Sequence, residues 1–219
     1  MTVAAYLARI RLNPYSKDVQ RDLRYATEMH KTLMRLVPDN VGDTPRQDTG
    51  LLYRLDDNEH ESVLLVQAAI PLTPHRLPSG YGTVDVKSLA PMFAALRKDL
   101  TVRYRITVSP VKRERLPLEQ KNQRGKVIPL TGAQADQWWT RRASEAGLHL
   151  HSSTATSLRP ASSRRNDTHP IKHQLIRYDG TATITDPQAL TAAVLDGIGR
   201  GKSYGAGLLS LAPVSPRAE

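Results

Sequence analysis

Two different hydrophobic periods mark the beginning of the chain. Residues 3–12, in which apolar and polar residues alternate from Ala8 to Leu12, predict a β-strand that ends at a turn formed by Asn13-Pro14. From Ser16, a candidate N-cap, apolar residues recur at helical spacing as far as Val37. We therefore predict one continuous helix here, with an apolar stripe made of Val19, Leu23, Ala26, Leu33 and Val37.

Residues 38–92 have the pattern of three strands and two irregular segments. The polar stretch 38–50 contains Gly and Pro and predicts a loop. Residues 71–80 contain three prolines, so a regular helix is not expected there. The apolar-rich stretches that predict strands are 51–55, 62–70 and 81–89.

The second half of the chain repeats this order of elements. A glycine at 147 ends the first predicted helix, and Asp186 followed by Pro187 begins the second one. Between the first strand and the first helix, residues 110–126 are basic and polar and predict a loop. The predicted elements are strand 101–109, helix 134–146, strands 148–157 and 171–184, helix 187–196 and strand 208–213.

This order, β-α-β-β-α-β, is that of the ferredoxin-like fold. The first half has the same order, except that its second helix is degraded by the prolines at 71–80. We therefore predict an α+β protein of two tandem ferredoxin-like domains, residues 1–92 and residues 93–219.

The charge balance points to a polyanionic partner. Lys and Arg number 31 against 21 Asp and Glu, which gives a formal net charge of +10. Nucleic acid, an acidic membrane surface and an acidic protein all fit this charge. The longest apolar stretch, Val63–Leu72, is interrupted by Gln67 and falls short of the ~20 residues that a spanning helix needs. With no secretory signal pattern at residues 1–14, a cytoplasmic protein without a membrane partner is expected.

A glycine-rich segment spans residues 197–207. It is not a Walker loop, because Asp196 occupies the position of that motif's first glycine and a helix precedes the segment instead of following it. Glycine's conformational freedom predicts a tight turn here. We also expect its backbone N–H groups, with Arg200, Lys202 and Ser203, to hold RNA phosphates without a nucleotide cofactor.

A second basic segment joins the predicted strands 148–157 and 171–184. Arginines with small polar residues between them suit a phosphate backbone, although most charge runs are simply solvated. Aromatic residues make up only 5% of the chain, which favours recognition of a folded RNA through phosphates and shape over base stacking. The candidate RNA-binding residues of this segment are Arg159, Arg164, Arg165 and Lys172.

His30 is the candidate for proton transfer. A lone histidine at the edge of an apolar stripe is more often a core residue, but Lys31 and Arg35 make its flank basic. RNA cleavage needs a group that exchanges protons near neutral pH beside a phosphate-binding surface. Cysteine is absent, which excludes thiolate metal sites and cysteine nucleophiles. A zinc site among His149, His151, His169 and His173 is disfavoured, because no cysteine and few nearby carboxylates complete it.

Three segments together resemble the CasE family, the repeat-processing endoribonucleases of type I-E CRISPR systems. The first is Thr27-Glu-Met-His-Lys-Thr-Leu-Met-Arg-Leu, and the second is Arg105-Ile-Thr-Val-Ser-Pro-Val-Lys-Arg. The third is the more specific C-terminal signature, Gly197-Ile-Gly-Arg-Gly-Lys-Ser-Tyr-Gly-Ala-Gly-Leu-Leu-Ser-Leu-Ala-Pro. They occur in the family's order over nearly the whole chain.

The resemblance implies tandem ferredoxin-like domains and a metal-independent, single-turnover endoribonuclease without cofactors. Such an enzyme cuts the CRISPR repeat at the 3′ base of its hairpin, leaves a 2′,3′-cyclic phosphate, and stays on the mature guide RNA beside the other subunits of Cascade. His30 matches the family's catalytic histidine. Thr27 occupies the position of an auxiliary tyrosine in the most comparable members.

Two other functions remain open from the residues alone. One is a non-catalytic RNA-binding subunit in which His30 packs in the core, and the other is a basic scaffold for an acidic protein. Binding of an RNA hairpin would argue against the scaffold. Strand scission without added metal would argue against the non-catalytic subunit.

Overall fold

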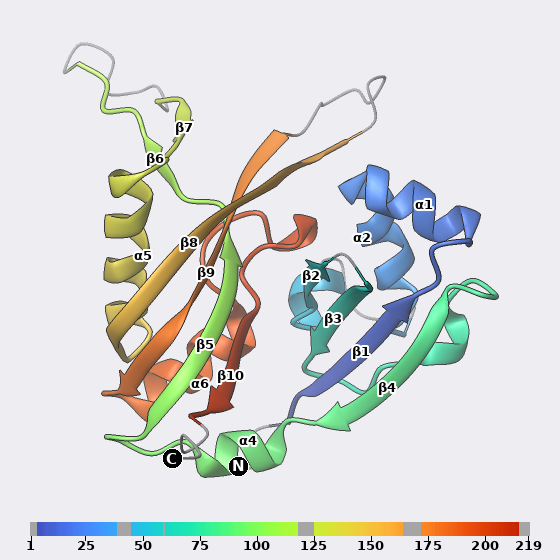
Figure 1. Cartoon of the computed structure of the whole chain (residues 1–219), viewed down its shortest axis with the longest axis horizontal. Helices are drawn as coiled ribbons and strands as arrows, with labels where there is room; N and C mark the ends of the chain where they lie inside the picture. Colours follow the sequence, from blue (N-terminus) through green and yellow to red (C-terminus); the bar gives the residue numbers. More distant parts are fainter. Residues whose placement is uncertain (1–3, 39–44, 59, 118–124, 164–171, 215–219) are drawn as a thin grey trace.

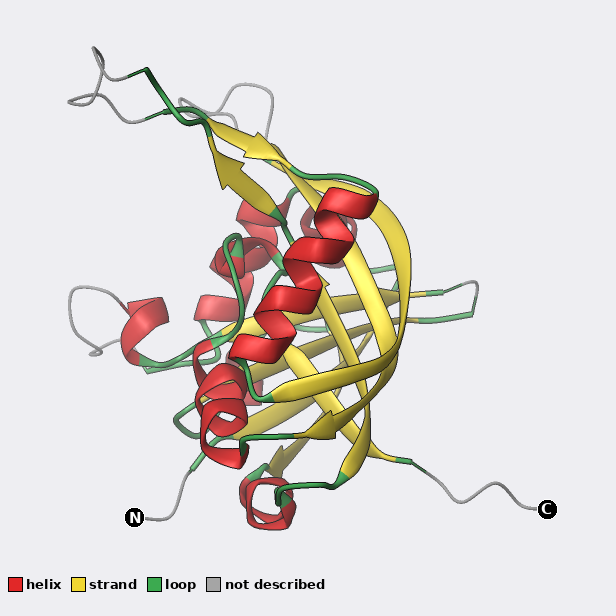
Figure 2. Ribbon diagram, turned by 90° about the vertical axis from the view of Figure 1, so that its left-hand side faces the viewer, coloured by secondary structure: helices red, strands yellow, loops and turns green. Residues whose placement is uncertain are grey.

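The computed structural model of the protein contains two antiparallel sheets with helices packed on them (Figures 1 and 2). It describes residues 4–38, 45–58, 60–117, 125–163 and 172–214. Within these residues, no helix combines the length and the hydropathy needed to cross a membrane.

Each sheet has four strands in the same spatial order. The first sheet is ordered β2-β3-β1-β4 and the second β10-β5-β9-β8. In both, the strand that comes first in the sequence lies between the fourth and the third, and all neighbours are antiparallel. This confirms two ferredoxin-like units. The strands are β1 (Tyr6–Leu12), β2 (Leu52–Asp57), β3 (Ser62–Ala68), β4 (Gly82–Ser88), β5 (Thr101–Val108), β8 (Leu148–Ser162), β9 (Lys172–Ile184) and β10 (Leu209–Pro213).

The helices follow the predicted scheme, with a few additions. In the first unit, the position of the second helix is occupied by a single 3-10 turn, η1 (Pro74–Arg76), as the prolines predict. In the second unit, α6 (Pro187–Asp196) begins at the predicted residue, and the Asp186 carboxylate accepts hydrogen bonds from the N–H groups of Gln188 and Ala189 at 2.9 and 3.0 Å. The remaining elements are α1 (Lys17–Arg24), α2 (Ala26–Met34), α3 (Pro45–Asp48), α4 (Ala90–Ala95), β6 (Val111–Arg113), β7 (Val127–Pro129), α5 (Ala133–Glu145) and η3 (Lys202–Tyr204).

The prediction of one helix from Ser16 to Val37 is wrong. Ser16 does cap α1, but the chain becomes extended at Tyr25 (φ −130°, ψ 110°), and α2 starts in a new direction. The cause is a buried polar cluster. The carboxylate of Asp22 is fully buried, and it accepts hydrogen bonds from Arg21 and from the hydroxyl of Tyr81 at 2.9 Å. A buried carboxylate needs such partners, and the break lets α1 supply them.

Two segments with the sequence pattern of loops contain short regular elements. The short helix α3 lies within 38–50, and β6 and β7 pair as a two-stranded ribbon that flanks 118–124. The linker between the two units also forms α4, whose Met92 and Phe93 pack on the core of the second unit. The division at residues 92 and 93 stays a prediction.

Buried hydrogen bonds join the two units where β2 and β3 meet β5, β10 and α6. Arg54, with 3% of its surface exposed, binds both carboxylate oxygens of Asp56 at 2.9 Å. Its Nη1 also donates to the carbonyl of Arg105 at 3.1 Å and to Ser210 Oγ at 2.9 Å. Gln67 Nε2 donates to the carbonyl of Val194 at 2.7 Å. The contact between the two units is therefore specific, because separating them would leave these buried polar groups without partners.

Candidate nucleic-acid interface and catalytic site

The position of α2 is fixed by hydrogen bonds from α1 and from the residue before β4. Arg21 Nη2 donates to Thr32 Oγ1 at 3.2 Å, and Tyr81, which binds Asp22, lies 3.4 Å from the sulfur of Met29. Burial and the neighbouring Asp22 carboxylate raise the pKa of Tyr81, so its hydroxyl stays protonated as a donor. Met29 and Thr32 flank His30 in the sequence, so this cluster sets the position of that histidine.

His30 lies half-buried on α2, outside the core that Met29 and Leu33 enter. Its Nδ1 is buried and has no hydrogen-bond partner among the described residues. Burial, together with the positive charge of Arg46, lowers the pKa of the imidazole below its ordinary value. The ring is therefore held predominantly neutral at neutral pH, able to accept a proton. This placement differs from that of a packed core histidine with satisfied ring nitrogens.

The other predicted residues of this helix lie in two different environments. Thr27, one turn before His30, is half-buried, and its hydroxyl is buried without a hydrogen-bond partner in the described part of the chain. Lys31 is 71% exposed and donates to Glu28 Oε1 at 3.0 Å, and Arg35 is exposed at the C-cap of α2. Lys31 and Arg35 therefore face solvent, whereas Thr27 and His30 are half-buried. The helix α2 carries a proton-transfer group and solvent-facing cations close together.

The glycine-rich segment forms a structured turn that packs against α2 and β2. All of its glycines have positive φ, and Gly201 (φ 78°) and Gly205 (φ 83°) flank η3 in the left-handed region. The predicted tight turn is thus confirmed. The turn is fixed to the first unit by Tyr53, whose hydroxyl donates to the carbonyl of Ser203 at 3.1 Å. It brings the C-terminal signature of the chain next to the helix that carries His30.

The candidate phosphate-binding residues of this turn differ in exposure and in the contacts they already make within the protein. Arg200 is exposed, and its backbone forms an isolated bridge with Ser109, the residue that follows β5. Lys202 is half-buried, and its Nζ donates to the carbonyl of Asp196 at 2.6 Å, at the C-terminal end of α6. Burial and the charge of Arg46 lower the pKa of Lys202. Ser203 contributes its carbonyl to the contact with Tyr53. Arg200 is therefore free to meet a ligand, whereas Lys202 already has a structural contact.

The β8–β9 hairpin carries the second basic segment, and β8 approaches α2. Arg159 is exposed on β8, and Lys172 is the first residue of β9, paired with Ser162. Arg164 and Arg165 lie outside the described residues. In Figure 1 the described ends of β8 and β9 extend from the second sheet toward α1 and α2.

Sequence reasoning assigned no role in this region to Arg46, His173 or Tyr204. Arg46, in α3, acts electrostatically on both His30 and Lys202. His173 of β9 stacks on Tyr204, with ring centroids 5.0 Å apart and an interplanar angle of 21°. No periodic signal marks Arg46, which sits in a polar stretch, and the stacking depends on a contact between β9 and the turn. Both placements arise from tertiary packing.

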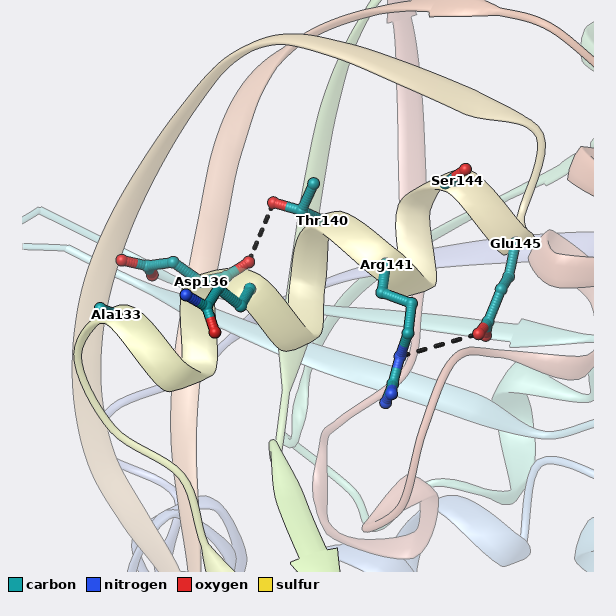
Figure 3. A pocket seen from close by; sticks show the side chains of 7 residues that line it. Ala133, Asp136, Thr140, Arg141, Ser144 and Glu145 are labelled. Carbon is teal, nitrogen blue, oxygen red and sulfur yellow. Dashed lines mark hydrogen bonds and ion pairs between the residues drawn. The ribbon is translucent and has the colours of Figure 1, made fainter.

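Other features of the structure do not contribute to this site. An open groove of about 600 Å³ runs along α5 and is lined by Asp136, Thr140, Arg141 and Glu145 among others (Figure 3). It contains none of the predicted site residues. His149 and His151 contact each other edge to face, 5.5 Å apart, and no group of three or more His, Cys, Asp or Glu suited to a metal ion occurs in the described residues. His169 lies outside them.

Comparison with known proteins gives concordant results. The family model described as "CRISPR associated protein" matches residues 5–213. The chain is 28% identical to the CRISPR-associated endoribonuclease Cse3 of Thermus thermophilus, over 95% of this chain and 100% of that protein. It is also 28% identical to the CRISPR system Cascade subunit CasE of Escherichia coli, over 85% and 92% of the two chains. A structure of Thermus thermophilus Cse3, bound to an RNA representing a pre-cleavage complex, superimposes with a TM-score of 0.79 and 30% identity, covering 95% of this chain and 99% of that one.

Proposed function

Because the chain belongs to the CRISPR-associated protein family, and within it to the CasE/Cse3 group, we propose that it is the endoribonuclease that processes CRISPR repeat RNA in a type I-E system. Its substrate is the repeat hairpin, which it cuts at the 3′ base. It then stays on the mature guide RNA as a subunit of Cascade. Similarity to an RNA-bound endoribonuclease over 95% of this chain supports the substrate class.

One observation supports catalysis more than any other. His30 is half-buried at the junction of the two units, with a lowered pKa and a buried Nδ1 that has no protein partner among the described residues. Solvent-facing cations, Lys31 and Arg35, lie on the same helix, and the glycine-rich turn packs against it. A group that exchanges protons, placed beside a surface suited to phosphates, is what RNA scission requires.

The reaction that fits these residues is attack by the RNA's own 2′-hydroxyl. The 2′-oxygen forms a bond to phosphorus while the bond from phosphorus to the 5′-oxygen breaks. The 2′-hydroxyl gives its proton to the base, and the leaving 5′-oxygen takes a proton from water, so a 2′,3′-cyclic phosphate and a 5′-hydroxyl result. We assign His30 as the base, because its lowered pKa keeps the imidazole neutral and ready to accept the proton. Thr27, one turn away on α2, contributes a hydroxyl beside it.

RNA binding is assigned to cations from both units. Lys31 and Arg35 extend from α2, and Arg200 with Lys202 and Ser203 belongs to the glycine-rich turn. Arg159 and Lys172 extend this surface onto the β8–β9 hairpin, and Arg164 and Arg165 continue it in sequence. Arginine binds phosphate oxygens through its planar fork, so such a surface follows an RNA backbone independently of base sequence.

The test is incubation of the purified protein with the repeat RNA of its host in EDTA, followed by mapping of the cut. We expect a single cut at the 3′ base of the hairpin. An RNA whose hairpin stem is unpaired by substitution serves as the matched control and should stay intact. Tight hairpin binding without scission would support a non-catalytic RNA-binding subunit instead.

A further inference from the structure

Arg46 is a half-buried arginine whose charge is not neutralised by any carboxylate within the described residues. It belongs to the single-turn helix α3, directly before β2. Its carbonyl accepts a hydrogen bond from the N–H of Leu51 at 3.0 Å, which fixes the backbone. Its guanidinium makes one long hydrogen bond, from Nη1 to the carbonyl of Leu51 at 3.5 Å. Most of the donors of this guanidinium therefore remain available to a ligand.

The surroundings of Arg46 bring it to the candidate catalytic site. Leu51, to which it bonds, precedes β2, and β2 is joined to the glycine-rich turn by the hydrogen bond from Tyr53 to Ser203. The same turn packs against α2, the helix of His30. The positive charge of Arg46 acts on both His30 and Lys202, so its guanidinium lies within electrostatic reach of each. Three segments, α2, α3 and η3, thus bring basic side chains from both units to one place.

The approach of Arg46 to Lys202 is unfavourable unless an anion joins them, whereas the neutral imidazole of His30 adds no repulsion. Like charges repel, and partial burial strengthens the repulsion because less water screens it. The acids nearby have other contacts. Glu28 accepts from Lys31 and faces Arg21, and the charge of Asp196 offsets only part of the effect of burial and of Arg46 on Lys202, whose pKa stays lowered. A phosphate between α2 and the turn would relieve the repulsion, and the forked donors of an arginine match its oxygens.

We propose that Arg46 is a catalytic residue that binds the non-bridging oxygens of the scissile phosphate, beside His30. This inference rests on the proposed function and assigns a role to α3. As the 2′-oxygen attacks, negative charge grows on those oxygens, and a fixed guanidinium stabilises it. Burial and the charge of Arg46 both lower the pKa of His30, so the same guanidinium helps to keep the base neutral and stabilises the charge that the base helps to create.

Two substitutions separate charge from geometry. Arg46→Gln removes the charge, and Arg46→Lys keeps the charge but lacks the fork. Neither changes the backbone hydrogen bond from Leu51 to residue 46. Arg141→Gln is the control, because Arg141 is an exposed arginine on α5, 3.7 Å from Glu145 and away from the site. Thermal unfolding of each variant verifies that it is folded.

The first measurement is single-turnover cleavage with enzyme in saturating excess. We expect Arg46→Gln to cleave about 10²–10³-fold more slowly, the effect typical of losing one donor to a developing oxyanion. Arg46→Lys should be intermediate, and Arg141→Gln unchanged. Binding of an uncleavable 2′-deoxy substrate should change only a few-fold, because the contact strengthens in the transition state.

The second measurement is an NMR titration of His30 in the free protein, which needs no RNA. Its pKa should rise in Arg46→Gln and stay near the wild-type value in Arg46→Lys. The other charged or titratable groups on α2 and on the elements packed against it are the same in all variants, so the difference reports on Arg46. They are Glu28 and Lys31 on α2, Lys17, Asp18, Arg21, Asp22 and Arg24 on α1, Lys202 and Tyr204 on η3, and His149, His151 and Arg159 on β8.

The outcomes are distinguishable. A wild-type protein that cleaves, with an equally active and folded Arg46→Gln variant, would overturn this inference and leave the proposed function intact. An unchanged pKa of His30 in that variant would also overturn it, because Arg46 would then lie too far away. If the wild type itself does not cleave, the proposed function fails and this inference fails with it.

Discussion

The junction between the two units and the β8–β9 hairpin both carry basic residues, but in opposite surroundings. At the junction, Thr27, His30, Arg46 and Lys202 are half-buried, and burial and the charge of Arg46 lower the pKa of His30 and of Lys202. On the hairpin, Arg159 is exposed, so water and salt screen its charge. The junction is therefore suited to chemistry on one phosphate, and the hairpin to contact with a long phosphate backbone.

This difference predicts separable effects of mutation. Partly buried, preorganised groups act strongly on a transition state because little water screens them. Exposed cations release counterions from RNA and so contribute affinity that depends on salt. Substitutions at the junction should change rates, and substitutions on the hairpin should change binding.

The largest expected effect is that of His30→Ala. Loss of the base should slow single-turnover cleavage by about 10²–10⁴-fold, while hairpin binding stays nearly intact. Rates with excess enzyme and a separate binding assay measure the two quantities. Thr191→Ala, a substitution on α6 outside the proposed site, is a suitable control. If the cleavage rate of His30→Ala stayed within a few-fold of the wild-type rate, His30 would have only a packing role. The contrast between the junction and the hairpin would then not hold.

The pH dependence of cleavage sharpens the assignment of His30 as base. Because the pKa of His30 is lowered from 6.5, the neutral form should predominate at pH 7 and give way to the protonated form only as the pH falls further. Below that pKa the rate should fall about tenfold per pH unit, because only the neutral fraction accepts a proton. Rates at subsaturating enzyme concentration report the free protein. A rate that instead declines as pH rises from 6 to 8 would indicate that His30 acts as the acid.

On the hairpin, neutralising Arg164 and Arg165 together with Arg159 should weaken binding and reduce its salt dependence. For every phosphate that the variant no longer binds, the slope of log affinity against log salt should fall by roughly 0.7–0.9. The rate at saturating enzyme should change little. Binding measured across a salt series decides the matter, and an unchanged slope would show that this hairpin faces solvent in the complex.

The smallest effect is expected for Thr27→Tyr. The hydroxyl of Thr27 is buried without a partner in the described residues, and a tyrosine there would restore the residue type that comparable CasE members carry at this position. We expect activity equal to or somewhat above that of the wild type in single-turnover assays. If a folded variant cleaved much more slowly, the space beside His30 would be too small for a tyrosine, and Thr27 would be part of a tighter site.

Local signals are sufficient to predict most of the fold. The capping pattern at Asp186-Pro187 predicts α6 to the residue, and the prolines at 71–80 predict the missing helix of the first unit. The break at Tyr25 is not predictable in this way, because it depends on the hydrogen bond between Asp22 and Tyr81, which lie 59 residues apart in the sequence. The apolar residues Leu23, Ala26 and Leu33 continue the helical spacing across the break at Tyr25, so the periodicity continues where the helix does not.

The candidate site is predictable only where a residue type is informative by itself. His30 stands out because histidine titrates near neutral pH, and the glycines at 197–207 predict a turn. Arg46 is one of many arginines in a basic chain, and its role depends on α3, β2 and the glycine-rich turn packing together. The sequence predicts Lys202 as a free phosphate ligand, and the structure shows its ammonium bound to the end of α6.

The central claim is that the RNA supplies its own nucleophile and this protein supplies the proton transfer. The most direct test uses a repeat RNA with 2′-deoxyribose at the nucleotide just upstream of the scissile phosphate, in EDTA, with the all-ribose RNA as control. The account predicts that both bind alike and that only the ribose substrate is cut, leaving a 2′,3′-cyclic phosphate, or the 3′-phosphate it opens to, and a 5′-hydroxyl by mass spectrometry. Scission of the deoxy substrate, or a strict requirement for Mg²⁺ in the chemical step, would contradict it.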